Sequence, residues 1–309
     1  MEFKLVYGNH GKDPVQVYET LLLIKFGLES LGHKADLEHN LSPGKTNILI
    51  ESFSYDFLEV YKEFSTTPGT EYIIVATEFL TGDTFNQFGE PRPEGDDLPH
   101  YENPRYWRKR HRTFVEASQR ARAVWHLSAS QTGVYRHGLG LEHVHYLPHG
   151  HVAQLERVHH QSHEHKDIDV LFTGTPTAYR DQVLSDLRVR GLAVRFSLPR
   201  SAVQREDLVG RSKVAVNIRQ SAEWKYPSNS RYHYHITNSS LLVSERCDET
   251  CDLSPYVVEA EAGRLFEACD ALTSGTRYRR EARERLERFR AEMPMRPLMS
   301  DLLDASYAP

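Results

Sequence analysis

The chain has 309 residues, with 38 Lys and Arg against 43 Asp and Glu, so its formal charge is −5. This length favours two domains, and a hydrophobic content of 39% excludes global disorder. The negative charge disfavours a nucleic-acid partner, although it still permits a local basic groove. The three cysteines cannot form a fully paired disulfide framework, which favours a reducing, cytoplasmic location.

The amino-terminal sequence MEFKLVYGNHGKD has neither the apolar core nor the cleavage site of a secretory signal. No apolar run approaches the roughly 20 residues that a membrane helix needs. We therefore expect no transmembrane segment, and peripheral membrane contact at most.

Strand-like and helix-like stretches alternate through the first half of the chain. Short apolar runs predict strands over residues 3–7, 33–37, 46–51, 71–77, 123–127 and 143–147. Asp13-Pro14 is a typical helix start, and Gly32 ends the expected helix over residues 14–31. The Pro- and Gly-rich segment 82–103 predicts a long loop, and a helix is expected over 104–121.

Residues 153–167 contain four histidines but little apolar periodicity, which predicts a linker between two domains. The four are His159, His160, His163 and His165. A metal site is the alternative, but histidines without a fixed spacing specify no coordination geometry.

The alternation restarts after the linker. Strands are expected over residues 168–172, 192–196, 213–218 and 241–245, with helices over 179–189, 228–238, 263–272 and 277–292. Alternating strands and helices predict parallel sheets covered by helices. We therefore expect an α/β protein with two Rossmann-like, doubly wound domains, 1–152 and 168–292, facing an interdomain cleft. The tail 293–309 is expected to pack back on the first domain.

Ligands of such sheets bind at the carboxyl ends of the strands, so the loops there carry the candidate site residues. Asn9, His10 and Gly11 follow the first strand, where an ordinary turn is the alternative. The lack of a GxGxxG motif argues against a dinucleotide dehydrogenase. Glu78 follows the fourth strand and is placed for acid–base chemistry, or for capping the loop. His149 either faces the cleft or is a buried structural histidine.

The second domain has four cations after its strands. They are Arg180, Arg219, Lys225 and Arg231. Together with the Gly174-Thr175 turn and Ser230 at a helix start, they could hold a diphosphate without a metal, unless they are simply solvated surface charges. Glu245 ends the next strand and could accept hydrogen bonds from sugar hydroxyls.

Two further patterns carry weaker signals. Cys247 and Cys251 lack the second pair that a zinc site requires. The Arg- and Glu-rich helix over residues 277–292 could contact an anionic membrane or nucleic acid, but its composition is also typical of a surface helix with ion pairs.

These residues together resemble the GT-B glycosyltransferases, above all the spore-maturation (CgeB-like) group. The matching segments are VLFTG at 170–174 with Arg180, VNIR at 216–219, Ser230-Arg231, LLVSE at 241–245, and LPHG at 147–150. The family has a Glu three residues after the helix-opening Arg, and that Glu usually engages the nucleotide ribose. Here Tyr234 occupies that position, and Ser239 replaces a glycine, so nucleotide binding would be rearranged.

The resemblance implies a metal-independent glycosyltransferase that moves a sugar from a nucleotide sugar to a glycan, lipid-linked or protein acceptor. The second domain would hold the donor, with Tyr234 beside the cations, and His10 and Glu78 would act at the acceptor. No cofactor or metal is expected. The alternatives are a non-catalytic GT-B-like binding or structural protein, a sugar-nucleotide epimerase, and a glycosyltransferase of DNA bases.

Overall fold

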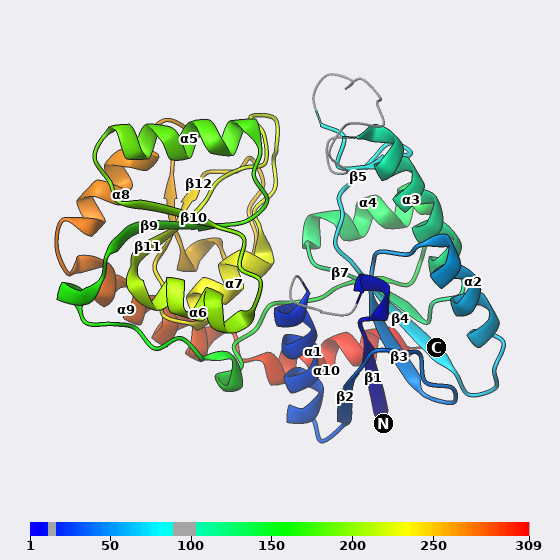
Figure 1. Ribbon diagram of the computed structural model, residues 1–309. Helices are drawn as coiled ribbons and strands as arrows, with labels where there is room; N and C mark the ends of the chain where they lie inside the picture. Colours follow the sequence, from blue (N-terminus) through cyan, green and yellow to red (C-terminus); the bar gives the residue numbers. More distant parts are fainter. Residues whose placement is uncertain (12–16, 89–102, 309) are drawn as a thin grey trace. The chain divides into compact units, whose positions relative to one another are not determined.

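A computed structural model describes residues 1–11, 17–88 and 103–308 of the chain (Figure 1). The chain divides into two compact units. The first comprises Met1–Pro148 and Arg296–Pro309, and the second comprises His149–Met295. Each unit is built around its own parallel sheet.

The first unit contains a six-stranded sheet in the order β2-β1-β3-β4-β7-β8, and every neighbouring pair is parallel. Its strands are β1 (Glu2–Val6), β2 (Lys34–Glu38), β3 (Thr46–Ile50), β4 (Glu71–Ala76), β7 (Ala123–His126) and β8 (Val144–Tyr146). Its helices are α1 (Tyr18–Ser30), α2 (Tyr55–Phe64), α3 (Pro104–Ser118), α4 (Ala129–Leu139) and α10 (Met295–Tyr307), with a 3-10 turn η1 (Gly8–His10).

Both faces of this sheet are covered, which explains its near-continuous apolar strands. On one face, side chains of α2, α3 and α4 form a single core with those of β3, β4 and β7. On the other face, the buried Trp125 of β7 donates a hydrogen bond from Nε1 to Ser306 Oγ of α10 at 2.8 Å. The carboxyl-terminal segment that the sequence predicts as a short tail is thus a helix, and it completes the first unit.

Two features of the first unit differ from the sequence prediction: two additional helices and a small β-pair. Helices α2 and α4 were not expected, although Ser54 caps α2 by accepting a hydrogen bond from Phe57 N at 3.2 Å. The expected loop over 82–103 begins with part of a small antiparallel pair, β5 (Leu80–Thr81) and β6 (Thr84–Phe85). The expected helix start at Asp13-Pro14 and residues 89–102 of the loop lie outside the described residues.

The second unit contains a five-stranded parallel sheet in the order β10-β9-β11-β12-β13. Its strands are β9 (Ile168–Thr173), β10 (Val194–Ser197), β11 (Ser212–Asn217), β12 (Leu242–Glu245) and β13 (Val258–Ala260). Its helices are α5 (Ala178–Val189), α6 (Ala202–Arg211), α7 (Asn229–Thr237), α8 (Leu265–Thr273) and α9 (Arg277–Glu292). Cores with α5 and α8 cover one face, and cores with α6 and α7 cover the other.

The segment 153–167, expected as a solvated linker, lies against the second unit. It contains two short 3-10 helices, η3 (Ala153–Leu155) and η4 (His163–His165). Asn238 at the end of α7 accepts hydrogen bonds from the backbone N of Arg157 and Val158 at 2.8 and 3.0 Å, and from His160 Nε2 at 2.8 Å. Local composition did not reveal these contacts, because their partner is about 80 residues away in the sequence.

Among the described residues, no group of three or more His, Cys, Asp or Glu side chains is arranged to hold a metal ion. In the same part of the chain, no helix is both long and apolar enough to span a membrane.

Candidate functional site

The carboxyl edge of the second sheet brings Arg180 and Arg231 to one place, beside Gly174. Arg180 extends from the first turn of α5 and is held by backbone carbonyls: Nε donates to the O atoms of Ile218 and Arg219, each at 3.2 Å, and Nη1 donates to Thr175 O at 2.9 Å. These carbonyls follow β9 and β11, so the strand ends fix the position of the guanidinium.

Arg231 enters the same place from the first turn of α7. Its Nη1 donates to Asn217 Oδ1 at 2.5 Å, at the end of β11. The guanidinium carbons of Arg231 and Arg180 lie 5.2 and 5.4 Å from the centre of the Phe172 ring. Gly174 makes this approach feasible, because a Cβ there would lie only 2.6 Å from Arg231 Nη2.

The two guanidiniums have neutral hydrogen-bond partners but no carboxylate. No ion pair involves either of them within the described part of the chain. Burial lowers the pKa of Arg180 to about 10, and burial together with the charge of Arg180 lowers the pKa of Arg231 to about 9. Both side chains are therefore charged at neutral pH. Glu245 is close enough for its charge to act on Arg180 but forms no ion pair with it, so the two adjacent guanidiniums can serve as an anion site.

The start of α7 adds backbone donors to this site. Its N-cap residue, Ser228, makes no side-chain capping bond, so its hydroxyl does not satisfy the amide groups of the first turn. Ser230 lies in that turn and is partly exposed. Free N–H groups and the positive end of the helix dipole favour an anion at this position.

Arg219 does not join the anion site as a free cation, which corrects the expectation of four converging charges. Its Nη2 lies 3.3 Å from Glu245 Oε1, and its backbone N donates to Glu245 Oε2 at 3.0 Å. The Tyr179 hydroxyl also donates to Glu245 Oε1. Lys225 is exposed on the loop between β11 and α7. Among the described residues, Arg180 and Arg231 are thus the two guanidiniums of the predicted set that form no ion pair, while Lys225 is solvent-exposed.

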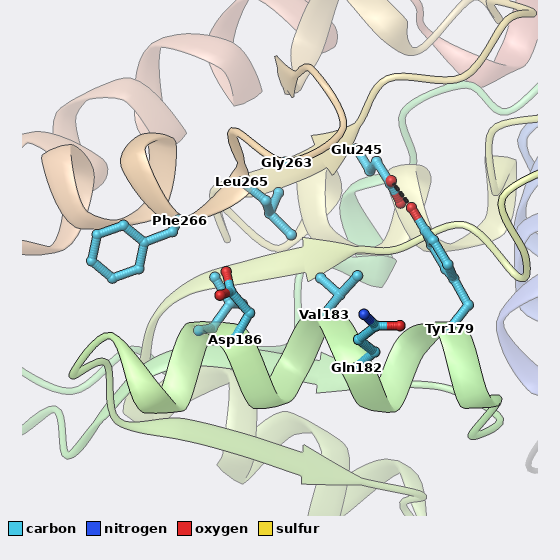
Figure 2. A pocket seen from close by; sticks show the side chains of 9 residues that line it. Tyr179, Gln182, Val183, Asp186, Glu245, Gly263, Leu265 and Phe266 are labelled. Carbon is cyan, nitrogen blue, oxygen red and sulfur yellow. Dashed lines mark hydrogen bonds between the residues drawn. The ribbon is translucent and has the colours of Figure 1, made fainter.

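A pocket of about 270 Å³ opens next to the Arg219–Glu245 pair (Figure 2). One wall is α5, which contributes Tyr179 and Val183, and the other is the start of α8, which contributes Leu265 and Phe266. Figure 2 shows the hydrogen-bonded Tyr179 and Glu245 at one end of the pocket. Glu245 Oε1 already accepts from Tyr179 and from the Arg219 side chain, whereas Oε2 accepts from Arg219 N and retains a lone pair. The pocket thus combines apolar side chains with one hydroxyl acceptor.

Tyr234 lies elsewhere, which corrects its expected place beside the cations. Its ring is buried in the core between the sheet and α6, together with Leu171 and Leu208. The Arg205 guanidinium carbon lies over the same ring, 4.3 Å from its centre. Tyr234 is three positions after Arg231, but the two side chains contact different residues, so Tyr234 is a core residue.

The carboxyl edge of the first sheet carries a buried charge network that includes Glu78. Arg110 of α3 donates from Nε to Glu51 Oε1 at 3.1 Å, and its Nη2 lies 2.9 Å from Glu78 Oε1. Glu78 also accepts hydrogen bonds from Thr77 Oγ1 at 3.1 Å and from Asn86 Nδ2 at 2.5 Å. Although burial opposes the charge, the two carboxylates raise the pKa of Arg110. Glu78 is thus an ion-pair partner of Arg110 and accepts a hydrogen bond from Asn86.

His10 lies beside this network in η1. Its Nε2 is 3.1 Å from Ile50 O, and because a carbonyl only accepts, Nε2 carries the hydrogen and Nδ1 has the lone pair. Burial and the nearby Arg110 lower the pKa of His10, so the ring is neutral at neutral pH. Asn9 holds the turn through hydrogen bonds to Ile50 O and Ser52 O at 2.5 and 3.3 Å. His10 can therefore accept a proton at Nδ1.

The remaining candidates have structural surroundings. Gly11 has a φ of +90°, which favours glycine and ends the η1 turn. His149 is buried in the second unit, with its ring centre 5.7 Å from that of His233. Its expected location in an interdomain cleft stays a prediction.

Sequence reasoning missed Glu51 and Arg110. Glu51 ends the TNILIE run, so its position after a strand was a usable signal. Arg110 is one of several basic residues on α3, and only the fold brings it to a carboxylate 59 residues away.

The amino-acid sequence matches no protein-family model and no curated protein sequence at a significant level. Solved structures do resemble the fold. A sucrose-phosphate synthase from Thermosynechococcus elongatus has a TM-score of 0.58 at 10% identity, covering 100% of this chain and 99% of that one. The DNA-modifying enzyme β-glucosyltransferase has a TM-score of 0.57 at 10% identity, covering 99% of both chains.

A Staphylococcus aureus TarM variant in complex with UDP has a TM-score of 0.52 at 11% identity. That match covers 93% of this chain but only 59% of TarM, so this chain spans less than two thirds of the TarM length. These similarities, with two parallel sheets each covered by helices on both faces, show that the chain has the GT-B glycosyltransferase fold.

Proposed function

We propose that the chain is a glycosyltransferase that moves a sugar from a nucleotide-sugar donor to an acceptor hydroxyl. The observation that carries this proposal is the pair of unpaired guanidiniums, Arg180 and Arg231, at the carboxyl edge of the second sheet. Two cations beside an uncapped helix start match the two phosphates of a nucleotide diphosphate. The resemblance to the CgeB-like group remains part of this proposal.

The neighbouring pocket supports a nucleotide rather than an isolated phosphate. Its apolar side chains, among them Val183 and Phe266, suit the flat faces of a base, and Gln182 and Asp186 add polar groups. Glu245 Oε2 can accept a hydrogen bond from a ribose hydroxyl. Arg219 and Tyr179 hold the Glu245 carboxylate in place. The donor would therefore lie across the ends of β9, β11 and β12.

The two cations would also drive the chemistry. As the bond from the anomeric carbon to the diphosphate oxygen breaks, the electron pair moves onto the diphosphate. Fixed guanidiniums stabilise that developing charge without reorganising, which lowers the barrier. Because they do what a divalent cation does in other enzymes, we propose that the reaction requires no metal.

The first unit would supply the acceptor side. An acceptor hydroxyl becomes a better nucleophile if its proton moves to a base within hydrogen-bond reach. The Nδ1 lone pair of the neutral His10 is suited to this step, whereas Glu78 is occupied by Arg110 and Asn86. We therefore assign the base role to His10 and a positioning role to Glu78.

A thermal-shift panel of UDP, GDP, ADP and TDP tests the proposal. If one diphosphate stabilises the protein, the turnover of sugar nucleotides with that same nucleotide is then measured. We expect one diphosphate to raise the melting temperature more than its nucleoside does. Conversion of the sugar without its release from the nucleotide would instead identify an epimerase. If no nucleotide stabilised the protein, the proposal would be wrong.

A further inference from the structure

The second unit has another cationic pocket, at the amino ends of its strands and thus at the opposite edge of the sheet from Arg180 and Arg231. Lys166 precedes β9, Lys213 lies at the start of β11, and Ser239 precedes β12. Arg279 and Arg283 contribute the remaining cations from the first two turns of α9. We call this group, together with His160 and Tyr278, the amino-edge pocket. Its volume is about 110 Å³.

Lys166 is the buried cation of the amino-edge pocket, with 7% of its surface exposed. Its Nζ donates to Gly210 O and Ser212 O, both at 2.7 Å, and lies 3.3 Å from His160 Nδ1. His160 Nε2 donates to Asn238 O, so Nδ1 is the acceptor that faces the lysine. All three partners are neutral. Burial lowers the pKa of Lys166 to about 8, as expected for an ammonium group without a counter-charge.

The charges around Lys166 do not balance. Among the four cations, Lys213 pairs with Asp169 at 2.7 Å. Hydrogen bonds from Ser162 and the backbone lower the pKa of the Glu164 carboxyl most, and the nearby charge of Arg279 lowers it further. Arg279 thus has a carboxylate close by. Arg283 forms no ion pair with any described residue. Two of the four cations, the buried Lys166 and the exposed Arg283, thus have no carboxylate partner among the described residues.

The start of α9 is an independent sign of an anion. The N-cap residue Thr276 makes no side-chain capping bond, and the first turn has no acidic residue. That turn carries Arg277 and Arg280, which pair with Glu281 and Glu284 one turn later, and Arg279 at the pocket, although cations are unfavourable at the positive end of a helix dipole. An anion in the adjacent pocket would stabilise both the helix start and Arg279.

We propose that the amino-edge pocket binds a phosphate group, either as inorganic phosphate or as a phosphate monoester, at a site separate from the donor site. The pocket is larger than the space of one water molecule. Lys166 uses its three N–H donors on protein acceptors and supplies positive charge alone, while Arg279 and Arg283 can supply the donors that an oxyanion needs. The size of the pocket favours a single phosphate over an extended nucleic-acid backbone. This inference does not depend on the proposed glycosyltransferase activity.

Titration of the protein with inorganic phosphate, against chloride at equal ionic strength, tests the proposal by melting temperature and calorimetry. The test variant is Arg279→Ala/Arg283→Ala, because both side chains are exposed at the pocket and contribute little to the core. We expect it to bind phosphate at least tenfold more weakly, since charge-assisted hydrogen bonds are lost. The control is Arg277→Ala/Arg280→Ala, which removes the same charge from the same helix outside the pocket, together with the ion pairs to Glu281 and Glu284, and should leave phosphate binding unchanged.

Ser239→Asp provides a second variant that acts in the opposite direction. Ser239 has a φ of +50°, which Asp tolerates better than most residues, so the change places a carboxylate at the pocket with little strain. We expect a higher melting temperature without phosphate and loss of the phosphate-induced shift. An unchanged phosphate response in both pocket variants would overturn the proposal, as would a response that Arg231→Ala alone abolishes.

The phosphate group could belong to a soluble ligand or to a lipid headgroup. Co-sedimentation with phosphatidic acid vesicles, with phosphatidylcholine vesicles as reference, separates the two sources. Vesicle binding that inorganic phosphate competes away would assign the site to a headgroup. A phosphate response without vesicle binding would assign it to a soluble ligand.

Discussion

Replacement of Arg231 by alanine separates a donor-binding role from a structural one. The substitution removes one of two adjacent cations that have no carboxylate partner. If Arg231 holds the donor diphosphate, Arg231→Ala should weaken nucleotide diphosphate binding by about 1.5–3 kcal/mol, the range for hydrogen bonds to charged groups. That loss corresponds to roughly a tenfold to more than a hundredfold higher Kd.

The stability of the unliganded variant should change little, because two effects oppose each other. Asn217 loses a hydrogen bond worth about 1 kcal/mol, while Arg180 loses an unfavourable neighbour. We therefore expect the free energy of unfolding to stay within about 1 kcal/mol of the parent value. Arg231→Lys should recover only part of the affinity, because an ammonium group lacks the planar fork of a guanidinium.

Calorimetry of nucleotide diphosphate binding, with urea unfolding of each unliganded variant, measures both quantities. Arg188→Ala is the matched control, since Arg188 is an exposed arginine on α5. It should leave affinity and stability unchanged. An Arg231→Ala protein that binds the diphosphate normally but unfolds at lower urea concentration would refute the reasoning.

Four further predictions follow from particular contacts. Gly174→Ala should weaken nucleotide binding, because the added Cβ would lie 2.6 Å from Arg231 Nη2 and displace that flexible side chain. The Cβ would also lie 3.1 Å from Cζ of the buried Phe172, so we expect some loss of stability; calorimetry measures the affinity and urea unfolding the stability. His10→Gln should lower kcat about 100-fold or more and spare nucleotide affinity, since glutamine cannot accept the proton; parallel kinetics and binding measure the two effects. Burial lowers the pKa of both His126 and His233 to about 4. Below pH 6.5 the unfolded chain therefore binds more protons than the folded protein. The free energy of unfolding should fall between pH 6.5 and pH 4, by about 3 kcal/mol for each histidine. Urea unfolding across that range checks this, and a flat profile would contradict it. Turnover should survive EDTA; loss with EDTA and recovery with magnesium or manganese would show that the guanidinium pair is not sufficient.

The sequence by itself determined the two-sheet α/β architecture and the strand ends that carry candidate residues. Strand and helix periodicity is local, and parallel strands joined by helices place their carboxyl ends at one edge. Gly174, Arg180 and Arg231 could therefore be assigned to one edge before their contacts were known. Helices α2 and α4 escaped prediction, although Ser54 supplies a typical N-cap for α2.

Only the tertiary structure decided which charges are paired. Arg219 meets Glu245, and Arg110 meets both Glu51 and Glu78, through contacts between segments 26 to 59 residues apart. It also decided that the Tyr234 ring lies in the core against α6, and that the segment before β9 supplies Lys166 to a pocket. Local spacing gives the face of a helix or the end of a strand. The partner across that face depends on chain folding over long distances, and the partner determines whether a cation is neutralised or available to a ligand.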